Sequence, residues 1–244
     1  MKIGIIPARY TSSRFPGKPL ALIHNKPMIQ HVYERSKEAD LDKLIVATDD
    51  ERIKKAVESF GGEAIMTSSQ HTSGTDRCAE VATIFSLSNS DIIVNIQGDE
   101  PFIREEEINQ LIHLFEDHTI QIATLAKPIV DEKDITNKNK VKVVFSNTNR
   151  ALYFSRSPIP HPTHHVSFTA YKHLGIYAYR NDILQQITQL PLGKLEEIER
   201  LEQLRWLENN FHIHVAIVFY ESISIDTPED LKEIMKNNSY RLLI

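Results

Sequence analysis

Three basic side chains lie within ten residues of one another in the segment PARYTSSRFPGKPL, residues 7–20. They are Arg9, Arg14 and Lys18, and small hydroxyl residues stand between them. An arginine can bind two phosphate oxygens through its planar fork, and a lysine supplies a compact point charge. The segment therefore predicts a loop that holds a triphosphate, although a solvated basic loop would have the same composition.

The same segment lacks the two common glycine-rich phosphate motifs. Neither the Walker pattern of P-loop enzymes nor the GxGxxG pattern of dehydrogenases is present. Gly17 would still allow the backbone to approach a phosphate closely. The sequence argues against a P-loop kinase and against a dehydrogenase.

Two aspartates stand where predicted strands end. Asp99 follows the strand-like run at residues 91–96, and Asp226 lies between a predicted strand and a predicted helix. Magnesium in proteins takes one or two carboxylates together with phosphate oxygens and water, so both aspartates are candidate metal ligands. From the residues alone, Asp99 could equally be a turn residue, and Asp226 could belong to the start of the following helix.

The composition is that of a soluble folded protein. The chain has 244 residues, of which 41% are hydrophobic, and this is enough for a substantial core. A formal net charge of −5 and the lack of a basic tract argue against a nucleic-acid partner. The single Cys78 excludes an internal disulfide. Without a signal peptide or a run of about 18 apolar residues, we expect a cytoplasmic protein with no membrane partner.

Predicted strands and helices alternate through the first half of the chain. The strands are expected at residues 2–7, 44–48, 64–66 and 91–96, and the helices at 27–39, 51–60, 75–85 and 105–115. This alternation is typical of a three-layer α/β fold with a mostly parallel central sheet. Ligands bind beyond the carboxyl ends of such strands, so we expect the site in the loops that follow them.

The pattern changes in the second half. Three strands are predicted at residues 142–145, 152–155 and 172–179, without long helices between them. We expect one domain over residues 1–244, with 131–192 as a β-rich subregion. The remaining segments predict a helix at 195–209, a strand at 212–218 and a closing helix at 227–235, which Thr227 would cap.

Motifs along nearly the whole chain resemble those of the sugar-acid cytidylyltransferases. Besides the segment at residues 7–20, they are IVATD, HTSGTDR, VNIQGDEP, ALYFSR, HLGIYAY, LEQLR and DTPED, in the family's order. The set is specific, although no single motif is. The chain is especially similar to the members that act on 3-deoxy-manno-octulosonate (Kdo). The resemblance implies a Rossmann-like nucleotide-diphospho-sugar transferase fold, Mg²⁺ as cofactor, CTP and an acid sugar as partners, and a homodimer to which residues 131–192 contribute.

The resemblance also assigns roles to individual residues. Lys18, Arg14 and Asp99 would be catalytic, and Asp99 and Asp226 would bind Mg²⁺. The residues that would bind the nucleotide are Pro7, Ala8, Arg9, Arg14, Lys18, Ser73, Gly74, Thr75 and Arg77, the last against the cytosine base. Those that would bind the acid sugar are Gln97, Arg156, His173, Tyr177, Glu202 and Gln203.

Several of these residues also have a purely structural interpretation. Ser73 or Thr75 could cap the helix predicted at 75–85. The pair Glu202 and Gln203 could form a solvated helix face, and His173 could be a core histidine that bonds a backbone carbonyl.

A second group of histidines lies in a proline-rich stretch. His161, His164 and His165 have no partner at regular ligand spacing, so we expect an irregular loop there and no zinc site. The chain also departs from the usual family pattern, with Lys172 where arginine is more common and Ala178 where glycine is usual. Both changes bear on the shape of the sugar pocket.

The resemblance implies that CMP is transferred from CTP to Kdo, with release of pyrophosphate, in lipopolysaccharide biosynthesis. One alternative is the same reaction on a sialic acid or on 8-amino-Kdo. Another is a non-catalytic nucleotide-binding protein. A glycosyltransferase on a related fold would usually carry an Asp-x-Asp motif, whereas QGDEP has one aspartate followed by glutamate.

Overall fold

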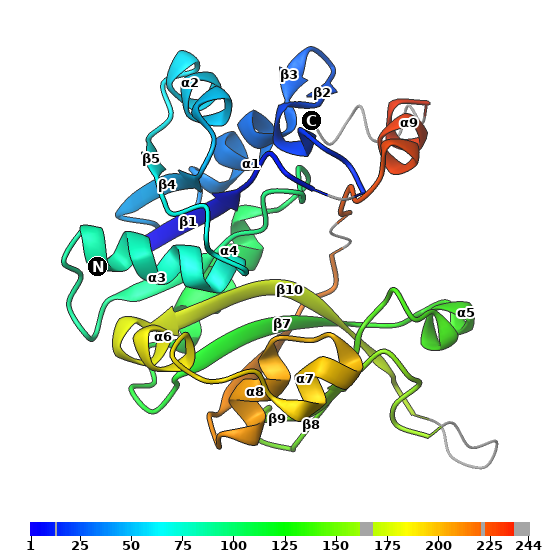
Figure 1. The fold of residues 1–244 in the computed structure, drawn as a ribbon. Coiled ribbons are helices and arrows are strands. Elements are labelled where there is room, and N and C mark those ends of the chain that lie inside the picture. The colour runs from blue at the N-terminus through cyan, green and yellow to red at the C-terminus, as the bar shows by residue number, and fades with distance from the viewer. Residues whose placement is uncertain (13, 162–167, 221–222, 237–244) are drawn as a thin grey trace.

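A mixed β-sheet forms the centre of the molecule (Figure 1). The computed structural model describes residues 1–12, 14–161, 168–220 and 223–236. In spatial order the strands of the main path are β11 (Ile213–Ile217), β7 (Ile122–Pro128), β10 (Tyr171–Arg180), β6 (Ile92–Asn95), β1 (Lys2–Ala8), β4 (Lys43–Thr48) and β5 (Ala64–Met66). All of them run in one direction except β10, which is antiparallel to both of its neighbours.

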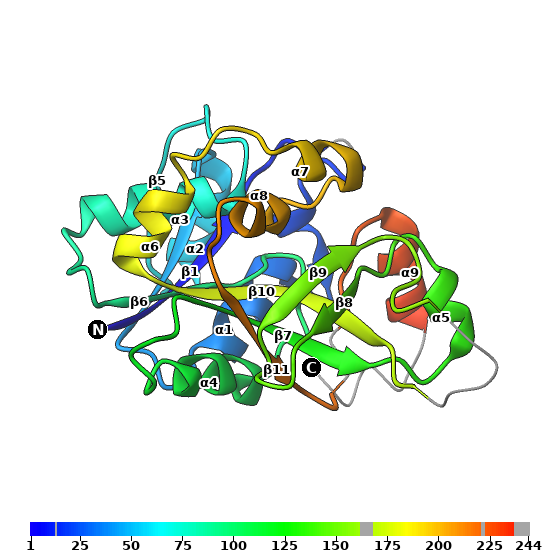
Figure 2. The same cartoon turned by 90° about the horizontal axis from the view of Figure 1, so that it is seen from below.

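Helices cover both faces of this sheet (Figure 2). One face carries α1 (Met28–Ser36), α2 (Glu51–Ser59) and α4 (Glu105–Leu114), and the other carries α3 (Gly74–Ile84), α6 (Asn181–Ile187) and α8 (Gln203–Glu208). Successive β1 residues point to opposite faces, so Ile6 packs with the first group and Ile5 with the second. The three-layer α/β fold with a mostly parallel sheet is confirmed.

Strand β10 changes partner along its length. Residues 177–180 pair with β6, whereas Tyr171 and Lys172 pair with β8 (Lys142–Phe145), which in turn pairs with β9 (Ala151–Ser155). Gly175 lies between these two sets of pairs, where the register of β10 against β7 also shifts. The sheet edge is therefore divided at the point where the loop after β6 begins.

The single helix predicted at residues 195–209 is wrong. The segment forms α7 (Lys194–Glu199) and α8, separated by a turn in which Arg200 has the left-handed conformation, with φ of 54°. The two helices fold back on each other because the Glu196 carboxylate accepts two hydrogen bonds from Arg205, at 2.5 and 2.7 Å. Hydrophobic spacing does not reveal a turn that depends on such a pair.

The remaining elements are short. They are the 3₁₀-helix η1 (Lys18–Leu20), the hairpin strands β2 (Leu22–Ile23) and β3 (Lys26–Pro27), α5 (Glu132–Thr136) and α9 (Pro228–Lys236). Strand β7 and helices α5 and α6 were not predicted, so the segment 131–192 contains two helices beside its three strands. In the described part of the chain, no helix has the length and apolarity needed to cross a membrane.

Candidate active site

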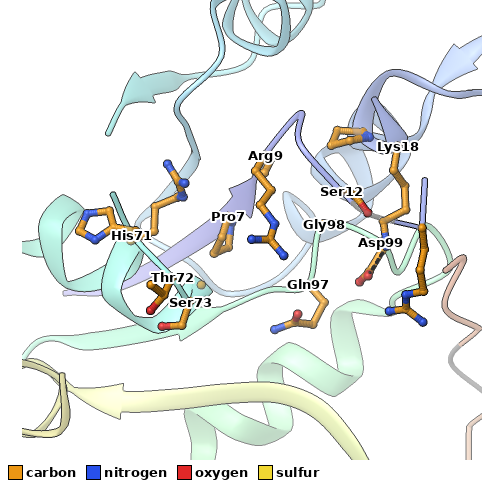
Figure 3. Close-up of a pocket in the computed structure, with 15 residues that line it drawn as sticks. Pro7, Arg9, Ser12, Lys18, His71, Thr72, Ser73, Gln97, Gly98 and Asp99 are labelled. Carbon is orange, nitrogen blue, oxygen red and sulfur yellow. Dashed lines mark hydrogen bonds and ion pairs between the residues drawn. The ribbon is translucent and has the colours of Figure 1, made fainter. Parts of the chain in front are cut away.

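A cleft of about 250 Å³ lies beyond the carboxyl ends of β1 and β6 (Figure 3). Its walls come from the loop after β1, the start of α3 and the loop after β6. Every residue expected to bind the nucleotide lines this cleft except Thr75. Figure 3 shows Pro7 and Arg9 between the Ser73 end of the cleft and the end where Lys18 and Asp99 meet.

The loop after β1 is held by a contact between Gly17 and Tyr10. The Gly17 N–H donates to the Tyr10 carbonyl at 2.8 Å, and φ of Gly17 is +71°. A Cβ at this position would also lie 3.1 Å from the Tyr10 ring. The Arg52 guanidinium of α2 lies 3.3 Å from the centroid of that ring. Glycine satisfies both the backbone angle and the close packing, and Lys18 is positioned directly after it.

The loop after β6 packs against the end of β1. A Cβ on Gly98 would lie only 2.9 Å from the Pro7 carbonyl oxygen, so a larger residue would push the two loops apart. This close approach places Gln97 and Asp99, on either side of Gly98, along one wall of the cleft.

Four charged side chains meet at one end of the cleft. Lys18 Nζ lies 2.6 Å from Asp99 Oδ2 and 3.5 Å from Asp226 Oδ1, and Arg14 Nη2 lies 3.0 Å from the same Asp226 atom. The backbone also joins these segments, because the Ile225 N–H donates to the Asp99 carbonyl at 2.9 Å. The two aspartates expected to bind a metal are therefore brought together from distant parts of the chain.

The contacts at the start of α9 bear on whether the Asp226 side chain belongs to the start of that helix or is available as a metal ligand. The helix is capped by Thr227, whose hydroxyl accepts from the Asp230 N–H at 3.2 Å while Asp230 accepts from the Thr227 N–H at 2.8 Å. The Asp226 side chain instead points to Arg14 and Lys18. The prediction that Thr227 caps this helix is confirmed, and the Asp226 carboxylate instead contacts Arg14 and Lys18, which line the cleft.

The donor set at this end of the cleft fits Mg²⁺. The described residues contain no group of three or more His, Cys, Asp or Glu side chains suited to holding a metal. Magnesium commonly takes only one or two carboxylates and completes its shell with phosphates and water. Asp99 and Asp226 already share one cation, the Lys18 ammonium, so a second cation accompanied by phosphates is compatible with their placement.

The opposite end of the cleft is built on the first turn of α3. Ser73 caps this helix, because its hydroxyl accepts from the Asp76 N–H at 3.1 Å while the Asp76 carboxylate accepts from the Ser73 N–H. Arg77 is buried, donates to the Thr67 hydroxyl, and lies 3.2 Å from Asp49. These contacts fix the orientation of the guanidinium at the cleft wall.

A second cavity, of about 280 Å³, lies where β10 changes partner. His173, Tyr177 and Gln203 line it, as do Glu100 and Lys172. It lies next to the first cleft, because Gln97 of that cleft comes within 3.9 Å of the Cβ position at Gly175, which lines this cavity.

The wall of the second cavity is polar and aromatic. His173 Nε2 lies 3.0 Å from the Thr124 hydroxyl, and burial together with Lys172 lowers the pKa of His173 to about 3, so the ring is neutral. Gln203 is 5% exposed, and its Nε2 has no hydrogen-bond partner among the described residues. A buried amide N–H without a partner is costly, and a ligand hydroxyl would satisfy it.

Two residues expected to bind the sugar lie outside the lining of both cavities. The Glu202 carboxylate accepts from the Thr75 hydroxyl at 2.9 Å. The Arg156 guanidinium donates to three backbone carbonyls, those of Lys138, Glu199 and Arg200, at 2.8 to 3.3 Å. His161 is exposed, and His164 and His165 lie outside the described residues.

Comparisons with known proteins show the family of this chain. Residues 3–235 match the family model described as cytidylyltransferase. The chain belongs to the cytidylyltransferase family. It is 54% identical over 242 residues to the 3-deoxy-manno-octulosonate cytidylyltransferase of Thermodesulfovibrio yellowstonii, covering 94% of this chain and 95% of that protein.

Two further relatives bear on the substrates of this cytidylyltransferase. The 8-amino-3,8-dideoxy-manno-octulosonate cytidylyltransferase of Shewanella frigidimarina is 51% identical over 232 residues, covering 94% of this chain and 95% of that protein. A solved structure of a CMP:2-keto-3-deoxy-manno-octonic acid synthetase complexed with CTP superimposes with a TM-score of 0.92. That chain is 43% identical, and the match covers 98% of this chain and 99% of that one.

Two charged residues of the cytidylyltransferase's second cavity were not assigned a role from the sequence. Glu100 is buried, and its burial and the neighbouring Asp99 raise its pKa to about 8. Lys172 lines the same cavity. For Glu100 the signal in the sequence was its position next to Asp99. For Lys172 it was the departure from the family pattern, which pointed to the shape of the sugar pocket without giving this residue a role of its own.

Proposed function

We propose that this cytidylyltransferase transfers CMP from CTP to Kdo and releases pyrophosphate. The observation that carries the proposal is the adjacency of two cavities: a cationic cleft with Lys18, Asp99 and Asp226 at one end, and a polar, aromatic cavity beside it. The first suits a nucleoside triphosphate and the second a sugar with many hydroxyls. The relatives named for Kdo and the CTP complex of a similar chain support both halves.

The acid group of the sugar needs a cation, and two side chains compete for that role. Lys172 lines the second cavity, whereas the Arg156 guanidinium is bonded to three backbone carbonyls outside it. A charge-assisted hydrogen bond to a carboxylate requires a donor that faces the cavity. We therefore place the sugar carboxylate at Lys172, and keep Arg156, which the family resemblance assigns, as the alternative.

The reaction would be an in-line displacement at the α-phosphorus of CTP. The anomeric hydroxyl oxygen of the sugar would form a bond to this phosphorus and pass its proton to water, while the bond from the phosphorus to the bridging oxygen breaks and pyrophosphate leaves. Positioning and electrostatic stabilisation account for most of the rate acceleration in such a reaction. Lys18 and Arg14 would neutralise the phosphates and the leaving pyrophosphate, while Gln97 lies at the boundary of the two cavities, where the reacting atoms would meet.

Asp99 and Asp226 are the residues that would hold Mg²⁺ in this site. When bound, the metal would supply Lewis-acid stabilisation of phosphate charge and lower the pKa of a coordinated hydroxyl. Lys18 would turn from the aspartates to the phosphates, which lie within its reach in the same cleft.

The test is pyrophosphate release from CTP and Mg²⁺ with three acids in parallel: Kdo, 8-amino-Kdo and N-acetylneuraminate. Release with Kdo at a kcat/KM well above that of the other acids supports the proposal. A preference for 8-amino-Kdo would keep the reaction and change the acceptor, and the Shewanella relatives make that the second candidate. CTP binding without release with any acid would favour a non-catalytic nucleotide-binding protein.

Three further expectations belong to this proposal: a homodimer, a cytoplasmic location and a role in lipopolysaccharide biosynthesis. Residues 131–192 would contribute to the dimer contact and to the sugar site, since this segment supplies β8, β9 and β10. Sedimentation analysis of the full chain would measure the oligomeric state.

A further inference from the structure

We infer that Thr124 is a positioning residue that fixes the tautomer of His173, so that His173 presents a hydrogen-bond acceptor, Nδ1, to a hydroxyl of the sugar. This role rests on the proposed function and deepens it, because it names the kind of sugar group that this wall of the cavity binds. The two ring nitrogens of a neutral histidine have opposite hydrogen-bonding roles, so the tautomer decides which groups the ring can recognise.

Thr124 lies at a bulge of the sheet, where the register of β7 against β10 shifts. It pairs with Tyr177, whereas its neighbour in β7 pairs with Leu174, so two residues of β10 stand between these pairs. At this bulge the carbonyls of Leu174 and Ile176 both face the Thr124 hydroxyl, at 3.1 and 2.8 Å. Thr124 is fully buried, so its hydroxyl must satisfy its neighbours without water.

The single proton of the Thr124 hydroxyl determines the roles of these groups. Thr124 Oγ1 also lies 3.0 Å from His173 Nε2. A carbonyl can only accept, so a hydroxyl that donated to the ring would face the Ile176 carbonyl oxygen at 2.8 Å with no proton between the two oxygens. The hydroxyl therefore donates to a carbonyl, and its oxygen accepts from His173. Nε2 then carries the ring hydrogen, and Nδ1 carries none.

The surroundings of His173 keep the ring neutral and in place. Burial and Lys172 lower the pKa of His173 to about 3, so near neutral pH the ring has a single N–H. The ring centroids of Phe154 and Tyr177 lie 4.9 and 5.4 Å from that of His173. The backbone N–H of His173 donates to the Val141 carbonyl at 2.8 Å. The packed ring cannot exchange its two nitrogens without losing the bond to Thr124.

This tautomer sets the polarity of the sugar cavity, which His173 and Gln203 both line. Nδ1 of His173 offers an acceptor, and Nε2 of Gln203, which has no partner among the described residues, offers a donor. Sugar hydroxyls can serve both, because each one donates and accepts. A carboxylate has no proton to donate to Nδ1, so the acid group of the sugar would lie elsewhere in the cavity.

NMR on the isotope-labelled full chain reads the tautomer directly, because a ring nitrogen that carries hydrogen resonates well apart from one that does not. At pH 7 we expect the hydrogen of His173 on Nε2, and His173→Gln identifies its signals by their loss. His31 is an internal reference, since its Nε2 lies 2.9 Å from the Ile23 carbonyl and must also carry the hydrogen. A wild-type His173 with its hydrogen on Nδ1 overturns the inference.

Thr124→Val keeps the shape of the side chain and removes the acceptor. An Nε2–H would then be buried without a partner, so we expect the hydrogen to move to Nδ1 and the KM for Kdo to rise by about 5- to 100-fold, with the affinity for CTP unchanged. Thr124→Ser keeps the hydroxyl and should restore both the tautomer and the KM. A Thr124→Val variant with the wild-type tautomer, or with the changed tautomer and an unchanged KM, contradicts the inference.

The wild-type protein offers a test that does not depend on whether Thr124→Val folds. Kdo is added together with α,β-methylene-CTP and Mg²⁺, which do not allow turnover, and the His173 signals are followed. A sugar hydroxyl at Nδ1 should shift the Nδ1 signal as an accepted hydrogen bond does, and leave Nε2 almost unchanged. If Kdo binds and the Nδ1 signal does not move, the sugar does not use this acceptor, and the inference is overturned.

The tautomer and the proposed function fail in different ways. Hydrogen on Nδ1 in a wild-type protein that converts Kdo contradicts the role of Thr124 alone. Hydrogen on Nε2 in a protein that releases no pyrophosphate with Kdo or 8-amino-Kdo contradicts the proposed function, and with it the sugar contact, while the bond between Thr124 and His173 stands.

Discussion

Asp99 is attached to its surroundings at two points. Its carbonyl accepts from the Ile225 N–H, and its carboxylate receives the Lys18 ammonium. Both contacts are compatible with a metal ligand and with a structural aspartate. Replacing a metal ligand must lower the reaction rate more than the affinity for the nucleotide.

We expect Asp99→Asn to lower kcat by about 10²–10³-fold, because it removes charge from the group that would hold the metal. The dissociation constant for CTP, measured by calorimetry, should change far less. Asp40→Asn, at an exposed carboxylate paired with Lys2, serves as the control. An unchanged kcat in Asp99→Asn would exclude the metal role.

The two candidates for the sugar carboxylate can be separated by charge selectivity. Lys172→Met should raise the KM for Kdo by about 10–100-fold, the usual effect of losing a charge-assisted hydrogen bond, and Lys172→Arg should restore most of it. The carboxamide of Kdo should bind wild type and Lys172→Met alike. If Arg156→Met abolishes the preference for acid over amide while Lys172→Met keeps it, the carboxylate lies at Arg156.

At the scale of elements, the predictions made from sequence were accurate where local spacing determines the structure. The strand at residues 2–7 and the helix at 51–60 have such spacing, and both appear within a residue or so of the expected bounds. The turn at Arg200 does not, because it depends on a pairing between Glu196 and Arg205 that no periodicity encodes.

In the candidate site, too, some residues could be proposed from the sequence, whereas their arrangement depends on the tertiary fold. Lys18 could be proposed from the basic segment at residues 7–20, and Asp99 and Asp226 from their positions after predicted strands. That Asp226 meets the other two depends on the tertiary fold.

The family resemblance named His173, Tyr177 and Gln203, which line the second cavity. The residues alone did not locate this cavity, because it depends on where β10 exchanges β6 for β8, and a strand's own sequence does not specify its pairing partners.

The hairpin of α7 and α8 should be sensitive to its internal ion pair. Glu196→Ala leaves the Arg205 guanidinium, 15% exposed, without its carboxylate, and we expect it to lower the free energy of unfolding by about 3 kcal/mol. Glu197→Ala, at an exposed position of the same helix, should change it by about 0.5 kcal/mol or less. Urea unfolding measures both, and equal effects would show that the pair does not hold the hairpin.

At the scale of the whole molecule, the buried His173 links stability to pH. Its pKa is about 3 in the folded protein, because of burial and Lys172, against 6.5 when unfolded. The unfolded chain therefore binds the extra proton between these values, and this contribution to stability is lost as the pH falls below about 6.5.

A comparison with His173→Gln isolates this effect. Between pH 7 and pH 5, the wild type should lose about 2 kcal/mol more unfolding free energy than the variant. Urea titrations at the two pH values provide the measurement. Parallel pH profiles would show that His173 takes up its proton without unfolding.

The place of Lys18 between two aspartates has a consequence for the order of events in the cleft. Its ammonium neutralises charge on both carboxylates, so the free protein gains little by binding a further cation there. A triphosphate that enters the cleft would compete for this ammonium. Asp99 and Asp226 would then lose their cation, and the phosphates would add further negative charge. Under the proposed function, the nucleotide would therefore create the need for a divalent ion, and the affinity of the protein for Mg²⁺ should rise only when the nucleotide is bound.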